Sequence, residues 1–157
     1  MMKNKVALII SLFFLTTATY AQEVNEQSGN IDKVSGTVLR TTINRAEEKT
    51  IVKGWKGVMK DYDADVDTKN NGITAKEVKI ESIGTVGLEV LAEVRKSSDT
   101  QKEFIVMFLK NGTAISSTSD LSAFTAAKSI VREFANNMSK KATEDYQKAQ
   151  IKLFDDI

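Results

Sequence analysis

The sequence predicts an α+β fold, in which two helices pack on one face of an antiparallel β-meander in the order β-α-β-β-β-β-α. Apolar and polar residues alternate over 77–81 and 88–95, which is typical of strands with one face in water. Asn111-Gly112 follows an apolar segment and predicts a tight hairpin. Two segments with helical spacing of apolar residues enclose these strands, and strands joined by tight turns pair antiparallel.

The first 21 residues have the three zones of a cleavable signal peptide. Lys3 and Lys5 precede an apolar run from 6 to 15, and small residues lead to Ala21. A retained membrane anchor is the alternative, but it needs about 20 apolar residues. We therefore expect cleavage after Ala21, a flexible lead over 22–32 and one domain over 33–157. The mature protein should be periplasmic or secreted, without further contact with the membrane.

The composition excludes several classes of function. Of the 22 basic residues, Lys3 and Lys5 leave with the signal, so 20 remain against 21 acidic residues. A charge so near neutrality argues against a nucleic-acid partner. The chain has no histidine and no cysteine, which removes thiol chemistry, the usual zinc ligands and every Ser-His arrangement. We expect no catalytic residues, although carboxylate chemistry stays open.

The N-terminal half should contain one strand and one helix before a polar loop. Residues 34–43 are rich in β-branched side chains and predict the first strand. Asn44 and Glu47 have the spacing of a capping box, which predicts that a helix starts there. Its apolar positions lie on one stripe, and we expect Gly54 and Gly57 to allow close packing against a neighbour. The stripe comprises Ile51, Trp55, Val58, Met59 and Tyr62.

The second half should contain the meander and a long helix. We expect a polar loop over 61–72, strands around 78–80 and 88–94, and a strand over 104–109 that is apolar on both faces and therefore central. A brief strand should follow the hairpin at Ala114 and Ile115. One unbroken terminal helix of about 35 residues would be roughly 50 Å long. It must either break near Asn136-Asn137 or project from the domain and pack on a partner.

Alternating aspartates between the first helix and the next strand suggest a cation site. Asp61, Asp63, Asp65 and Asp67 could converge on calcium, which prefers several oxygen ligands. The EF-hand pattern is incomplete, because no register places both its glycine and its final glutamate. A solvated acidic loop is therefore our first interpretation. The alternative is a carboxylate- or metal-dependent hydrolase that uses this loop.

Large apolar side chains provide a second candidate site. They could line a pocket for an apolar ligand between the first helix and the central strand. Their periodicity favours a packed core over such a pocket. The candidates are Trp55, Met59, Phe104, Phe108 and Phe124.

Three segments resemble small exported proteins of Bacteroidota-type bacteria. They are 55–60 (Trp-Lys-Gly-Val-Met-Lys), 104–108 (Phe-Ile-Val-Met-Phe) and the serine-rich run before the terminal helix. The resemblance implies a Gram-negative periplasm or secretion and adds no functional residue. We expect a non-catalytic module that binds a protein or an apolar small molecule, or that forms a homo-oligomer through its C-terminal helix. A structural component of the envelope is the third possibility.

Overall fold

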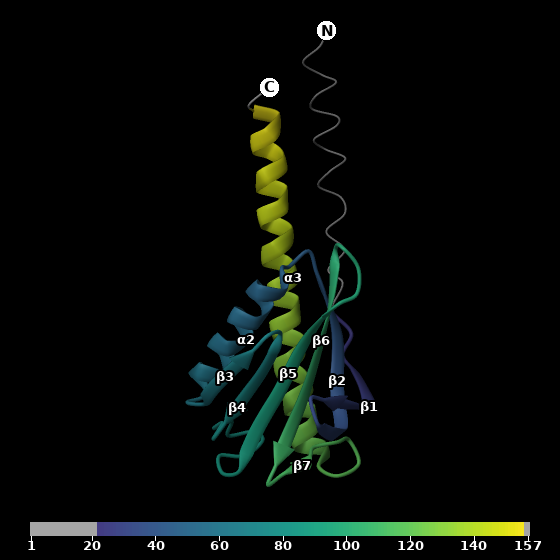
Figure 1. The fold of residues 1–157 in the computed structure, drawn as a ribbon, viewed down its shortest axis with the longest axis vertical. Coiled ribbons are helices and arrows are strands. Elements are labelled where there is room, and N and C mark those ends of the chain that lie inside the picture. The colour runs from purple at the N-terminus through teal and green to yellow at the C-terminus, as the bar shows by residue number, and fades with distance from the viewer. Residues whose placement is uncertain (1–21, 156–157) are drawn as a thin grey trace.

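The computed structural model describes residues 22–155, which form one antiparallel sheet and two helices (Figure 1). The predicted α+β class, the antiparallel meander and the long C-terminal helix are therefore confirmed. The signal peptide predicted over 1–21 lies outside the described residues. The strands are β1 (Asn25–Ile31), β2 (Val34–Asn44), β3 (Asp65–Lys69), β4 (Gly72–Lys76), β5 (Leu88–Lys96), β6 (Gln101–Lys110) and β7 (Thr113–Ala114), and the helices are α2 (Glu48–Asp61) and α3 (Leu121–Asp155).

The order of the strands in the sheet is β1-β2-β6-β5-β4-β3, and β7 pairs with the end of β6. Strands β3 to β6 are consecutive neighbours, whereas β2 joins the far side of β6 and β1 forms the edge beyond it. Helix α2 therefore carries the chain from β2 across to the opposite edge, where β3 begins. This crossing places α2 beside α3 on the same face (Figure 1).

The helices bury their apolar stripes against the sheet and form the main core. Ile51, Trp55 and Met59 of α2 are fully buried, as the predicted stripe requires. The first two-thirds of α3 contributes a matching face to the same core. That face consists of Ala123, Phe124, Ala127, Val131, Phe134 and Ala135.

A second, smaller apolar cluster lies on the other face of the sheet. Ile31 and Val38 of the β1–β2 hairpin pack there against Leu91, Ile105 and Met107. Strand β1 contacts β5, although β2 and β6 lie between them in the sheet, so the hairpin curls over this face. This cover explains why β6 is apolar on both faces, as the sequence predicted.

The prediction of a flexible lead over 22–32 is wrong, because most of it is strand β1. All seven residues of β1 pair with β2, from Asn25 opposite Arg40 to Ile31 opposite Val34. The segment contains few β-formers, and its order comes from backbone pairing and from the burial of Val24 and Ile31. Local composition could not reveal this pairing and burial.

Three local predictions between β2 and β5 are also wrong. The loop expected over 61–72 contains β3 and the start of β4, which form a hairpin. The strand expected around 78–80 is irregular, although Val78 and Ile80 are buried and Ile80 makes a single bridge with Gly84. The capping box is absent, because Asn44 ends β2 and α2 begins after Glu47 without a side-chain cap. In each case, side-chain packing or strand pairing determines the structure against the local sequence pattern.

The predictions for the hairpin turn and the terminal helix agree better with the structure. Asn111 and Gly112 both have positive φ, of 52° and 79°, as the predicted hairpin turn requires. The strand that follows is Thr113–Ala114, one residue earlier than expected. Asp120 caps α3, since its Oδ1 accepts the Ala123 N–H at 3.0 Å. Helix α3 continues through Asn136-Asn137 without a break, so its end projects (Figure 1).

Candidate interaction site

The structure does not bring the four candidate aspartates together as a metal site. Asp61 is the last residue of α2, and Asp63 lies in the following turn, with its Oδ2 3.6 Å from the Lys79 Nζ. Asp65 and Asp67 are exposed on the edge strand β3. Over residues 22–155, no three acidic, histidine or cysteine side chains are grouped closely enough to hold an ion. The alternating acids instead give an edge strand a charged, solvated side, which discourages pairing with other sheets.

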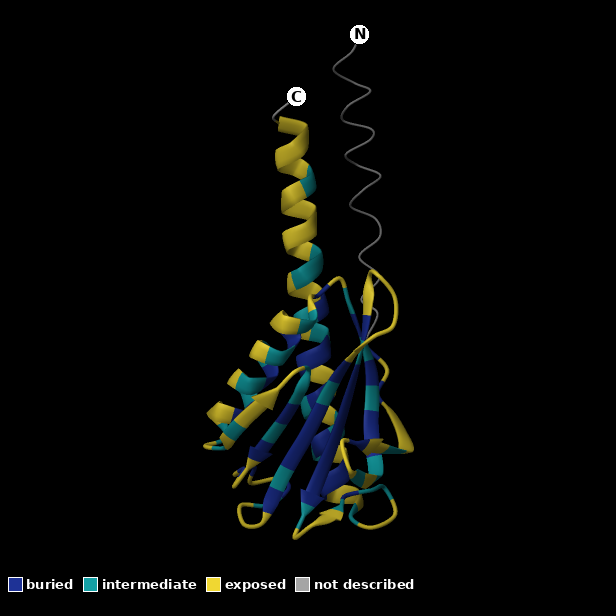
Figure 2. Cartoon of the chain, viewed as in Figure 1, coloured by how far each residue is buried: buried dark blue, intermediate teal, exposed yellow. Residues whose placement is uncertain are grey.

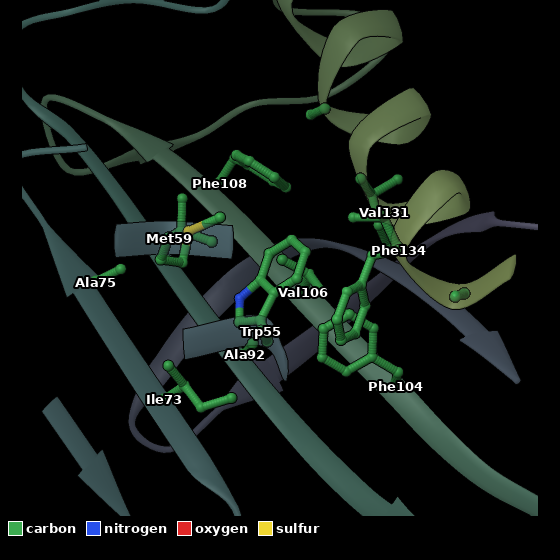
Figure 3. Close-up of a cluster of buried hydrophobic side chains, with 14 of the residues drawn as sticks. Trp55, Met59, Ile73, Ala75, Ala92, Phe104, Val106, Phe108, Val131 and Phe134 are labelled. Atoms are coloured by element: carbon green, nitrogen blue, oxygen red, sulfur yellow. The ribbon is translucent and has the colours of Figure 1, made fainter. Parts of the chain in front are cut away.

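The candidate pocket residues come together, but as members of the packed core. The ring centroids of Trp55 and Phe104 are 5.1 Å apart, and those of Trp55 and Phe134 are 5.0 Å apart, both edge to face (Figure 3). Met59, Phe108 and Phe124 are buried in the same cluster. The aromatic side chains thus fill the space that a ligand would need, and the core interpretation of the sequence holds.

Two shallow depressions on the surface are lined by other residues. The first, of about 270 Å³, lies between α2 and the β3–β4 turn and is lined by Lys49, Lys53 and Lys56 among others. The second, of similar volume, lies beside Arg40 and Glu103, whose side chains form an ion pair of 3.1 Å. Both depressions are open, and none of the five candidate pocket residues lines them.

The projecting end of α3, which we define as residues 143–155, carries the clearest apolar surface (Figure 2). Its side chains are mostly exposed, whereas the preceding two-thirds of the helix is anchored to the sheet. The exposed fractions are large for apolar side chains: Tyr146 47%, Ile151 61%, Leu153 59% and Phe154 76%. Exposed apolar residues gathered on one element mark surfaces that bind partners.

Part of this surface continues the buried face of α3. Ala142, Tyr146, Ala149 and Leu153 follow one another at intervals of four, three and four residues, so they lie on one stripe, which we call the seam. Extended backwards, the seam meets Ala135 and Val131, which pack against the sheet. The same apolar stripe is therefore covered by the sheet at one end of α3 and left without cover at the other.

One contact marks the point along the seam beyond which the seam residues no longer contact the domain. The guanidinium carbon of Arg45, in the β2–α2 connection, lies 4.3 Å from the centre of the Tyr146 ring. Such a cation–π contact covers part of the ring and leaves the rest to solvent. Beyond Tyr146, the seam residues Ala149 and Leu153 are exposed.

Neither helix within residues 22–155 combines the length and the apolar character that a bilayer-spanning segment needs. Comparison with known proteins finds no family model, no curated protein and no solved structure that matches this chain. The function must therefore be inferred from the geometry of the described residues.

Proposed function

We propose that the chain is an exported, non-catalytic interaction module that assembles through the projecting end of α3. The observation that carries this proposal is the seam, which runs from Ala142 to Leu153, beyond Ser139, the last buried residue of the helix. Export is supported by the signal-like residues 1–21, which the structure does not describe. The lack of histidine and cysteine supports a function that does not require imidazole or thiol chemistry.

The uncovered end of α3 gains little stability unless a partner covers it. Residues 143–155 span about 20 Å at 1.5 Å per residue. Isolated helices shorter than about 12–15 residues are marginal in water, so this end gains little stability by itself. Burying Leu153 against a second helix would gain about 1.5–3 kcal/mol by removing its side chain from water. A helical partner therefore stabilises both the seam and the helix that carries it.

The partner that fits best is the same helix of a second copy, packed antiparallel. The part of the apolar stripe that precedes the seam is covered by the sheet of its own chain, so a parallel partner helix would collide with that sheet. An antiparallel partner approaches from the free end and places the two domains at opposite ends of the helix pair. In a pair centred between Tyr146 and Ala149, each Tyr146 lies opposite the small Ala149 of the other copy, which allows close packing.

The charges beside the seam favour the same arrangement. Asp145 and Lys152 each precede a seam residue, Tyr146 and Leu153, and flank the seam on one side. Within one helix they are seven residues apart, about 10 Å along the axis, and do not pair. In an antiparallel pair, Asp145 of one copy faces Lys152 of the other, and the two-fold symmetry repeats this ion pair.

Size-exclusion chromatography with light scattering tests the proposal on the chain that starts at Gln22. We expect the mass of a dimer at high concentration, and a monomer when Leu153 is changed to Glu in the seam. Gln147→Glu is the matched control, because it introduces the same charge on the side of the helix away from the seam and should leave the dimer intact. A monomer for the unmodified chain over the full concentration range would refute the proposal, as would equal effects of the two variants.

A further inference from the structure

Gln22, the residue that follows the predicted signal, is held at both of its nitrogens by α3. Its backbone N–H donates to the Asn136 Oδ1 at 2.8 Å, and its side-chain Nε2 donates to the Ser139 Oγ at 3.2 Å. Gln22 and Ser139 are each only 9% exposed in the full chain. A polar side chain at the start of a mature chain is usually solvated and mobile, so this double anchoring needs an explanation.

The residues next to Gln22 fix the backbone at this position. The Glu23 carbonyl accepts the hydroxyl of Thr41 at 2.8 Å, and the Val24 side chain is fully buried in the main core. Ser139 Oγ also accepts the backbone N–H of Asn44 at 3.0 Å, which ties the end of β2 to the same point of α3. Residue 22 therefore occupies a built site between β2 and α3.

Cleavage after Ala21 would make Gln22 the first residue and give it a free amino group. An N-terminal glutamine can cyclise without a redox partner or a co-reactant. The α-nitrogen attacks the side-chain carbonyl carbon Cδ, the bond between Cδ and Nε2 breaks, and ammonia leaves. The product is a five-membered lactam, pyroglutamate, whose nitrogen carries one hydrogen and no charge.

We propose that Gln22 is a modification site, at which the N-terminus is cyclised to pyroglutamate and the lactam is held by Asn136 and Ser139. This inference depends on the proposed export, because it needs cleavage after Ala21. The structure gives the α-nitrogen one neutral acceptor, the Asn136 Oδ1, which matches the single N–H of a lactam. A free ammonium has three donors and a charge, and a site with one neutral acceptor satisfies it poorly. The Ser139 hydroxyl can donate to the lactam oxygen in place of the bond it now accepts.

Mass spectrometry of the N-terminal peptide from the natural exported protein tests the modification. We expect a peptide that begins at residue 22 and is lighter by one ammonia than the unmodified sequence. A peptide that begins at Gln22 with a free amine would overturn the modification and leave the proposed export standing. A peptide that begins at Met1 would overturn both, and a peptide that begins at any other residue would overturn the modification alone. None of these outcomes bears on assembly through α3, which light scattering measures separately.

Thermal unfolding tests whether Asn136 holds the lactam. The chain starting at Gln22 is compared before and after treatment with a glutaminyl cyclase, and Gln22→Asn, which cannot form the five-membered ring, serves as the untreatable control. We expect treatment to raise the Tm by about 3 °C, and the rise to disappear in Asn136→Ala. The exposed neighbour Asn137→Ala should keep the rise. An unchanged Tm after complete cyclisation would overturn the proposed docking.

Discussion

Two glycines three residues apart in α2 have different surroundings, and only one of them fits the close packing expected from the sequence. A Cβ built at Gly54 would lie 3.1 Å from the Met138 Sδ and 3.2 Å from the Phe134 Cε2. A Cβ at Gly57 would meet nothing within 4 Å. The packing explanation is therefore confirmed at Gly54 and wrong at Gly57, where the glycine only weakens the helix.

This difference predicts opposite consequences for the same substitution. Gly57→Ala should increase the free energy of unfolding by about 0.5–1 kcal/mol, because alanine favours the helix and fills open space. Gly54→Ala gains the same propensity but crowds Phe134 and Met138, so it should stabilise clearly less or destabilise. Urea unfolding of the two variants measures the difference. Equal stabilisation by both would show that α2 and α3 are not closely packed at Gly54.

Glu26 provides a pH-dependent contact between β1 and the segment before α3. Hydrogen bonds from Ser117, including its backbone N–H at 2.9 Å, lower the pKa of the Glu26 carboxyl from its ordinary value. A lowered pKa in the folded state stabilises the protein above the unfolded pKa of about 4.3, and this contribution is lost as the pH falls through the folded value. The effect should be small, because the carboxyl is largely exposed.

Glu26→Gln tests this contact. We expect the variant to be less stable than the parent at pH 7, and the difference to shrink as the pH falls below about 4. Urea midpoints at several pH values measure it. A difference that stays constant down to pH 2 would mean that the carboxylate charge plays no part.

Strands with strong side-chain signals could be predicted from the sequence, and strands held by pairing alone could not. Strands β2, β5 and β6 have β-branched or alternating apolar residues and were predicted close to their observed bounds. Strands β1 and β3 are polar edge strands, whose order comes from hydrogen bonds to the next strand, which lies just beyond a turn. No local pattern reports such pairing.

The β1–β2 hairpin also covers the second apolar face, and Val38 tests this role. Val38 is fully buried against β6, so Val38→Ala should lower the free energy of unfolding by about 2 kcal/mol through lost burial and a residual cavity. Val34→Ala, at a half-buried position of the same strand, should cost less than about 1 kcal/mol. Similar losses for the two variants would contradict the assignment of Val38 to this second core.

The projecting end of α3 should be dispensable for folding. A chain that ends at Lys148 keeps Tyr146 and its contact with Arg45 and loses only exposed or half-exposed residues. Its Tm in dilute solution should therefore fall by less than about 2 °C. A much larger fall for the monomer would mean that residues 149–155 stabilise the domain itself, and would remove the reason to assign them to a partner.

The sequence predicted the helix that carries the candidate site, but it could not decide whether this helix breaks near Asn136-Asn137 or projects from the domain. Asn136-Asn137 costs a helix only a fraction of a kcal/mol, and Asn136 is engaged by Gln22, so the helix continues. The candidate pocket could not be separated from a core until the positions of Trp55 and Phe104 were known. The anchoring of Gln22 depends on residues more than 100 positions away in the chain and leaves no local signal.

Residues 22–155 therefore form a domain with a closed interior and an uncovered seam. The core aromatic residues leave the interior filled, and the candidate acids are dispersed over the surface. What distinguishes the surface is an apolar helix end with complementary charges at Asp145 and Lys152. The proposed antiparallel self-association uses both features at once.

Exchange of these two charges tests that association most directly, by sedimentation equilibrium of four forms of the chain starting at Gln22. Asp145→Lys or Lys152→Asp alone places like charges opposite each other twice in the dimer, and each should weaken it about 3- to 10-fold. The double exchange restores opposite charges and should return the dissociation constant to within about twofold of the parent. Single variants that dimerise like the parent, or a double exchange as weak as the two losses combined, would contradict the antiparallel pairing of α3.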